Sequence, residues 1–211
     1  MVLKAFVPAL ALVAAVPATA WAGPAAGTGD VTGGADLNGD GHVDRVAVRQ
    51  VPDVPTAQEL VAVVRGVRFT ARMPLHSTIG AGPLRVVDLD GDGRNEVVVT
   101  GSFGANTELF TVWELRNGGL RAVTTPDGAP LALAEGGGVS ALSRYGCEVV
   151  DGQRRLVTVS GEVVWSSDPW VYDGERVTHA VRDGVATATS TTPVLAERDA
   201  PAYRVDPAAC A

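Results

Sequence analysis

The sequence predicts an all-β protein made of about three antiparallel units, each of the size of a propeller blade. After residue 22, no stretch keeps the apolar period of 3.6 that marks an amphipathic helix. Short valine-rich runs follow one another instead, separated by turns that contain glycine. This pattern is typical of antiparallel sheets.

Residues 1–22 are predicted to be a secretory signal peptide. Lys4 supplies a positive start, an alanine-rich apolar segment follows, and small residues at Ala20 and Ala22 mark a cleavage site. We therefore expect a secreted, extracellular protein with a flexible linker at residues 23–34 and a folded domain at residues 35–211. No later segment has the length and hydropathy of a membrane span.

Three hairpins are predicted where apolar runs flank a two-residue turn. The turns are Arg65-Gly66, Asn117-Gly118 and Asp173-Gly174, of which Asn-Gly is a strong hairpin signal. The strands expected on the two sides of these turns are residues 60–64 with 67–72, 109–115 with 120–124, and 170–172 with 176–180.

An acidic nine-residue motif occurs twice. Residues 36–44 read DLNGDGHVD and residues 88–96 read DLDGDGRNE, and a valine-rich run follows each copy. An altered third copy aligns at residues 147–155, where only Asp151 keeps an acidic position. The units expected from this repeat are about residues 35–82, 83–138 and 139–190, followed by a C-terminal segment.

Each acidic motif can supply oxygen ligands to a hard cation. Side-chain oxygens at positions 1, 3, 5 and 9 and the carbonyl at position 7 can converge, because glycines at positions 4 and 6 let the chain curl. The expected ligands are Asp36, Asn38, Asp40, the His42 carbonyl and Asp44 in one loop, and Asp88, Asp90, Asp92, the Arg94 carbonyl and Glu96 in the other. Two structural calcium ions are expected.

Other loop types share part of this pattern. An EF-hand carries a carboxylate at position 12 and a helix after the loop, whereas Ala47 and Val99 stand at position 12 inside valine-rich runs. This excludes the EF-hand. A single Asp/Gly-rich turn is often a solvated Asx turn, but a second copy with all ligand positions kept favours the cation site.

The two motifs, with the valine-rich runs that follow them, resemble the calcium loops of FG-GAP/VCBS repeats, the blades of integrin α-subunit propellers and of many exported bacterial proteins. The resemblance is close over residues 36–48 and 88–101. It implies a β-propeller-like fold, calcium at the loop positions given above, and an interaction with an extracellular protein or glycan. A closed propeller of that kind has more blades than this chain can form, so a partial or compact variant is expected.

Cys147 and Cys210 are the only cysteines. An even number in an exported protein predicts one disulfide, with two unpaired thiols as the alternative. Arg155 stands at position 9 of the altered third copy. One hypothesis is that Arg155 pairs with Asp151 in place of a cation while the disulfide fixes the loop; the alternative is that Arg155 is an exposed strand residue.

Charge and motifs argue against a nucleic-acid partner and against catalysis. The formal net charge is −7, with no basic stripe. His42, His76 and His179 are scattered, and no nucleophile elbow or phosphate-binding loop occurs. We expect a secreted, non-enzymatic, calcium-binding module for extracellular interaction or adhesion.

Two alternative functions stay open. A hydrolase or enzyme accessory domain with a site on the loops would need His76 or His179 beside carboxylates in a cleft. A carbohydrate-binding module would need Trp165 or Trp170 exposed. The alternation of Trp170 with Tyr172 along one predicted strand favours the core for both residues instead.

Overall fold

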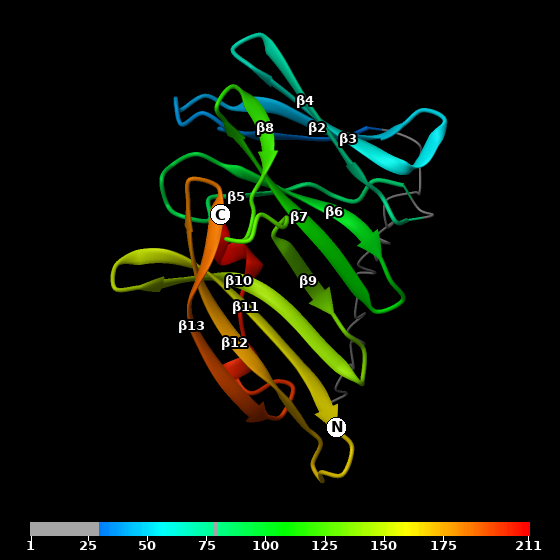
Figure 1. Cartoon of the computed structure of the whole chain (residues 1–211), viewed down its shortest axis with the longest axis vertical. Coiled ribbons are helices and arrows are strands. Elements are labelled where there is room, and N and C mark those ends of the chain that lie inside the picture. The colour runs from blue at the N-terminus through cyan, green and yellow to red at the C-terminus, as the bar shows by residue number, and fades with distance from the viewer. Residues whose placement is uncertain (1–29, 78–79) are drawn as a thin grey trace, which may run out of the picture.

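A computed structural model describes residues 30–77 and 80–211, and it confirms the all-β prediction (Figure 1). Within these residues the chain forms thirteen β-strands and two short 3-10 helices. The predicted signal peptide and most of the predicted linker lie outside the described residues. The end of that linker, residues 31–34, belongs to the first strand.

The first sheet is a four-stranded antiparallel meander in the order β1-β2-β3-β4. Its strands are β1 (Val31–Ala35), β2 (Asp44–Val51), β3 (Val54–Val64) and β4 (Val67–Pro74). Arg65 and Gly66 have positive φ and connect β3 to β4, which confirms this predicted hairpin.

The second sheet has nine strands and contains two more meanders. Its order is β13-β12-β11-β10-β9-β7-β6-β5, with β8 paired to β7. The strands of the meander β5–β8 are β5 (Arg85–Val87), β6 (Glu96–Phe103), β7 (Thr107–Arg116) and β8 (Gly119–Ala122). β9 (Ala132–Gly136) leads to the last meander, which consists of β10 (Ala141–Val150), β11 (Gln153–Val164), β12 (Val171–Arg182) and β13 (Val185–Ala196).

The sheets stay open and do not form a propeller. β7 is long enough to pair with β8 along one half and with β9 along the other. β9 then pairs with β10, so the last two meanders share one sheet and do not stand as separate blades. The predicted hairpin across Asn117-Gly118 is confirmed, since β7 and β8 join there.

The hairpin predicted at Asp173-Gly174 is wrong. Both residues lie inside β12, where Gly174 pairs with Gly161 of β11. A Cβ atom at Gly174 would lie 2.0 Å from the Ser160 carbonyl oxygen, so this glycine permits a close approach of two strands. The turn comes later, at Asp183-Gly184, where both residues have positive φ.

β6 connects the two halves of the core. Successive residues of a strand point to opposite faces. Val97 and Val99 accordingly pack in a cluster with residues of β2 and β3, while Val98 packs in a second cluster with residues of β7, β10 and β11. The meander β5–β8 is therefore covered on both faces, and its valine run is buried throughout.

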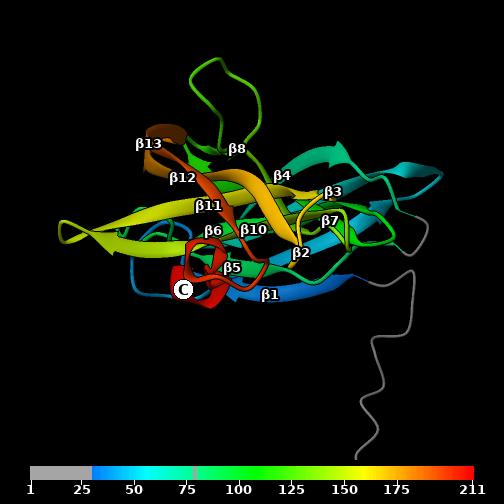
Figure 2. The ribbon, with the colours of Figure 1, turned by 90° about the horizontal axis from the view of Figure 1, so that it is seen from below.

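The C-terminal segment closes the domain beside β10 and the end of β5 (Figure 2). It forms the 3-10 helices η1 (Pro201–Tyr203) and η2 (Pro207–Cys210). Tyr203 is fully buried, and its hydroxyl lies 2.9 Å from the carbonyl oxygens of both Tyr172 and Val194. Tyr203 of η1 thus belongs to the core of the last meander, whereas Cys210 of η2 packs in the cluster that contains Val98.

Substitution of Gly174 by alanine is expected to destabilise the fold. The added Cβ would collide with the backbone of β11, so we expect the free energy of unfolding to fall by about 1–3 kcal/mol in urea denaturation. Gly119→Ala is the matched control, because a Cβ there has no neighbour within 4 Å. Equal stability of the two variants would contradict the close approach.

Candidate metal centre

The two acidic motifs occupy the same place in two hairpins. Ala35 pairs with Asp44 between β1 and β2, and Val87 pairs with Glu96 between β5 and β6. Position 9 of each motif is thus the first residue of the second strand, and positions 1 to 8 form the connecting loop. The sequence repeat corresponds to a structural repeat at these two hairpins.

The loops also share one pattern of hydrogen bonds. The aspartate at position 1 accepts from the main-chain amides of positions 4, 5 and 6. The N···O distances are 2.8, 3.1 and 2.7 Å for Asp36 and 2.8, 3.1 and 3.2 Å for Asp88. The side chains at positions 3 and 5 each accept from the amide two residues on. These bonds curl the loop around its acidic side chains.

Glycines make this curl possible. The residues at positions 4 and 6 have φ between 72° and 84°, a region that other L-residues rarely adopt. They are Gly39, Gly41, Gly91 and Gly93. The glycines of the motif are therefore required by the backbone, as the sequence pattern predicts.

A buried acid closes each loop at position 9. Asp44 accepts from the Leu37 amide at 3.1 Å, and Glu96 accepts from the Leu89 amide at 2.8 Å. Burial, followed by the nearby charges of the other loop carboxylates, raises the pKa of Glu96 to about 8. Carboxylates crowded in this way are stabilised by a positive charge.

The second loop gathers three carboxylates. Asp88, Asp90 and Asp92 each offer an oxygen, and these oxygens lie within 4.8 Å of one another. Burial and the adjacent Asp92 raise the pKa of Asp90. Hydrogen bonds from Arg94 lower the pKa of Asp92, although burial opposes them. The donor set consists of hard oxygens, which suits calcium better than a soft metal.

Position 5 of the first loop also pairs with an arginine, but this arginine comes from a different part of the chain. Asp40 accepts from Nε of Arg65 at 2.7 Å and from the Asn38 amide at 3.0 Å. The hydrogen bond from Arg65 holds the pKa of Asp40 far below its usual range. In the part of the chain that the structure describes, the three-carboxylate cluster occurs in the second loop and not in the first. Arg65 comes from the β3–β4 turn, and nothing in its local sequence marks this contact.

Asn95 joins the two loops. Its main-chain amide donates to the Asp36 carbonyl at 2.7 Å, and its side-chain oxygen accepts from the Asp36 amide at 2.8 Å. Position 8 of the second loop therefore holds position 1 of the first. This contact places the acidic loops next to each other, although the two residues are 59 positions apart.

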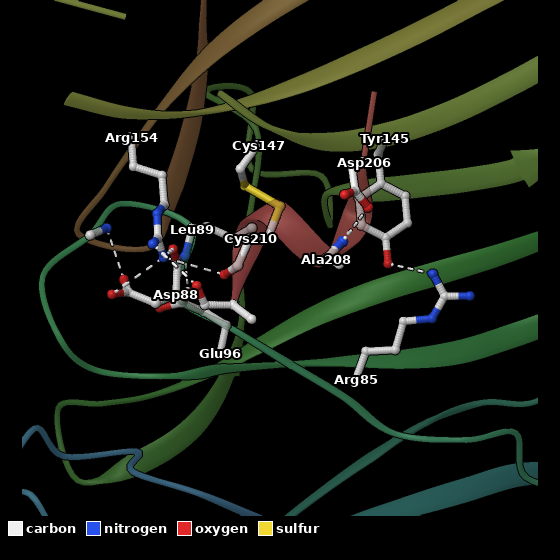
Figure 3. Close-up of a disulfide and its surroundings, with 12 residues drawn as sticks. Arg85, Asp88, Leu89, Glu96, Tyr145, Cys147, Arg154, Asp206, Ala208 and Cys210 are labelled. Atoms are coloured by element: carbon white, nitrogen blue, oxygen red, sulfur yellow. Dashed lines mark hydrogen bonds and ion pairs between the residues drawn. A yellow bond between two sulfur atoms is a disulfide. The ribbon is translucent and has the colours of Figure 1, made fainter. Parts of the chain in front are cut away.

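Arg154 and the C-terminus hold the second loop in the same way (Figure 3). The Asp88 amide donates to the Cys210 carbonyl at 2.7 Å, and the Arg154 guanidinium donates to the Asp88 carbonyl at 2.7 Å. Arg154 is the residue of the altered third copy that aligns with Asn95. The third copy does not form an acidic loop, but its Arg154 contacts the second loop.

The predicted disulfide between Cys147 and Cys210 is confirmed, with Cα atoms 4.8 Å apart. It attaches η2, and with it the Cys210 carbonyl, to β10. Of the two hypotheses for Arg155, pairing with Asp151 finds no support, and the alternative of a strand residue agrees with its place in β11. Asp151 lies in a two-residue turn between β10 and β11, and Arg155 donates to the Gln153 side chain. Neighbouring strand residues face opposite sides, so Arg154 and not Arg155 reaches the second loop.

Two clefts of about 410 and 490 Å³ flank the second loop, and both include Asp90 and Asp92. Neither contains His76 or His179. His76 is exposed beside Ser102, and His179 contacts the Thr158 hydroxyl at 3.0 Å, where burial lowers its pKa.

The tryptophan prediction is wrong in part. Tyr172 is buried as expected, but Trp165 and Trp170 are both exposed. Trp170 precedes the first residue of β12, so strand alternation does not bring it into the core.

Comparison with protein-family models, with curated proteins and with solved structures finds no match for this chain. The FG-GAP/VCBS resemblance stays a prediction from the two motifs. Among the described residues, no helix is long and apolar enough to span a membrane.

Loss of the disulfide should loosen the second loop more than the first. In a Cys147→Ser/Cys210→Ser variant, we expect the Asp88 amide to exchange with solvent at least about tenfold faster, because the Cys210 carbonyl is no longer held in place. Residue-resolved hydrogen exchange by NMR measures this. The Asp36 amide, which Asn95 holds, is the internal control, and equal acceleration at both amides would contradict a local role.

Proposed function

We propose that this protein is an exported, non-enzymatic calcium-binding module of the FG-GAP/VCBS type that interacts with a protein or glycan outside the cell. The observation that carries the proposal is the cluster of Asp88, Asp90 and Asp92 in a loop whose hydrogen-bond pattern recurs at residues 36–44. The cluster supplies the cation site, and the repeat argues against a chance acidic turn.

Calcium is the metal that this donor set favours. It takes six to eight oxygen ligands from a flexible loop. The second loop offers three clustered carboxylates, the buried Glu96, and a main-chain carbonyl at Arg94. The role is structural: the ion would offset the repulsion between these carboxylates and hold the β5–β6 connection in place.

The two sites differ in strength under this proposal. Both aspartates at position 5 already pair with an arginine, Asp40 with Arg65 and Asp92 with Arg94, so a cation must compete with a guanidinium in either loop. The loops differ at position 3, where Asn38 supplies a neutral side chain and the second loop has Asp90. The additional carboxylate makes the second loop the tighter site and the first loop the weaker one.

Export and the absence of catalysis rest on further observations. A disulfide is typical of an oxidising compartment, which agrees with a secretory segment at residues 1–22. The hydrolase alternative needs His76 or His179 beside carboxylates in a cleft, and the clefts at the second loop contain neither residue. A cleft at the first loop does bring His42 beside Asp40 and Asp44, but the His42 side chain is exposed there. An interaction role follows from the resemblance to FG-GAP/VCBS repeats.

Calcium should raise the stability of the protein. For dissociation constants of about 0.1–1 mM, typical of extracellular modules, 1 mM calcium is expected to add about 0.4–1.4 kcal/mol per site. Thermal melting with calcium and with a chelator measures the effect. The Asp90→Asn/Asp92→Asn variant should lose most of the response, while Asp30→Asn, outside both loops, should keep it. Identical melting in calcium and chelator would remove the calcium assignment.

Removal of Arg65 should strengthen the first site. Arg65→Ala frees the Asp40 carboxylate, so we expect a few-fold tighter calcium binding at the first loop by isothermal titration calorimetry. Arg68→Ala is the control, because Arg68 lies near Glu59 and not near Asp40. An unchanged first-site affinity in Arg65→Ala would show that this guanidinium does not compete with the cation.

A further inference from the structure

Two exposed tryptophans lie together at one end of the last meander, where residues 165–170 connect β11 to β12. Trp165 is 62 % exposed and Trp170 is 51 % exposed. Tryptophan is usually among the more buried residues. Neither ring belongs to any of the three core clusters of the described residues. The two indole rings are therefore not part of the hydrophobic core.

The connection that carries these rings is well anchored. The Ser167 hydroxyl donates to the Val164 carbonyl at 2.7 Å and accepts from the Val171 amide at 2.9 Å. Val164 and Val171 are also the last pair of the β11–β12 ladder. Ser167 thus closes the base of the loop, and the two rings next to this base need little ordering when a ligand binds.

The two rings contact each other edge to face. Their centroids are 5.5 Å apart and their planes cross at 78°. Tyr172 lies in the core two residues beyond Trp170, and its hydroxyl donates to the Val139 carbonyl at 2.7 Å. Trp165 and Trp170 accordingly lie at the edge of the core that contains Tyr172.

We propose that Trp165 and Trp170 form a binding site for a neutral, soluble polysaccharide. The apolar C–H faces of sugar rings pack on indole rings, and the indole N–H groups can donate to sugar hydroxyls. Asp168, which is exposed in the same loop, offers a carboxylate that accepts hydrogen bonds from hydroxyl groups. The aromatic rings thus suit the C–H face of a sugar, and the carboxylate suits its hydroxyl groups.

The surrounding charge selects against anionic ligands. Residues 156–175 contain no lysine or arginine. Two more exposed carboxylates, Glu162 and Asp173, pair across β11 and β12 near the base of the loop. Arg198 approaches this end of β12, but its guanidinium lies over the Tyr172 ring and donates to the carbonyls of Gly138 and Ala141. A sulfated or phosphorylated ligand, or an anionic lipid surface, would therefore meet an excess of negative charge here. A neutral polyhydroxyl ligand meets no such penalty.

The ring geometry selects the form of the polysaccharide. Planes that cross at 78° cannot both lie flat on the face of a crystal. They form a corner, which a single chain in solution can enter so that one ring stacks on a sugar and the other contacts its edge. Soluble chains are therefore the expected ligand, and crystalline cellulose is not.

Affinity electrophoresis with the purified protein tests the site, with laminarin, hydroxyethyl cellulose and dextran as soluble probes and microcrystalline cellulose in a pull-down. We expect retardation by at least one soluble probe, and a loss of at least about tenfold in affinity in both Trp165→Ala and Trp170→Ala. Val67→Ala is the control, because Val67 is exposed to a similar degree on β4 of the first sheet. All variants are compared by circular dichroism to verify folding.

Several outcomes would overturn the proposal. These are the absence of retardation by all three soluble probes, full binding by a Trp165→Ala/Trp170→Ala variant, binding to crystalline cellulose alone, and tryptophan-dependent binding to vesicles of phosphatidylglycerol. Repeating the measurement in chelator separates this proposal from the calcium one. Retardation should persist, because none of the carboxylates at residues 36–44 and 88–96 lies at this end of β11 and β12.

Discussion

The aspartate at the start of each acidic loop accepts hydrogen bonds from three main-chain amides. The geometry of the candidate metal centre depends on this interaction. A carboxylate that bonds the amides of positions 4, 5 and 6 draws the chain into a tight curl, which glycines at positions 4 and 6 permit. The curl brings the carboxylates of Asp88, Asp90 and Asp92 together. Their mutual repulsion is then what a cation would relieve.

In both loops, groups from another part of the chain hydrogen-bond to the main chain at position 1, although these groups differ between the loops. Asn95 holds the main chain of Asp36, while Arg154 and the Cys210 carbonyl hold that of Asp88. The disulfide thus has a local role beside its general one, because it fixes the C-terminal turn that completes the second loop (Figure 3). The third copy of the motif has become a plain hairpin turn, and it still contributes Arg154 and the disulfide-bonded Cys147 to the second loop.

The fold separates the acidic loops from the exposed tryptophans. The loops lie at the β1–β2 and β5–β6 connections. The strands that follow them, β2 and β6, pack against each other in one core cluster, and β6 also contributes to the second cluster. The tryptophans lie at the β11–β12 connection, at the bottom of Figure 1, beyond the core of the last meander. A cation that stabilises the first region and a ligand that binds the second would therefore act on different parts of the domain.

The sequence by itself determined the features that depend on local chemistry. The all-β class, the Arg65-Gly66 and Asn117-Gly118 turns, the acidic loops and the disulfide could all be predicted, because each follows from residue types at short spacing or from a count of cysteines. Only the tertiary structure decided the rest. The local signal of Asp173-Gly174 is that of a turn, but contact with a neighbouring strand makes Gly174 a close-approach residue. Arg65 and Arg154 reach their acidic partners across the fold, and no local pattern encodes contacts that depend on how distant strands pack.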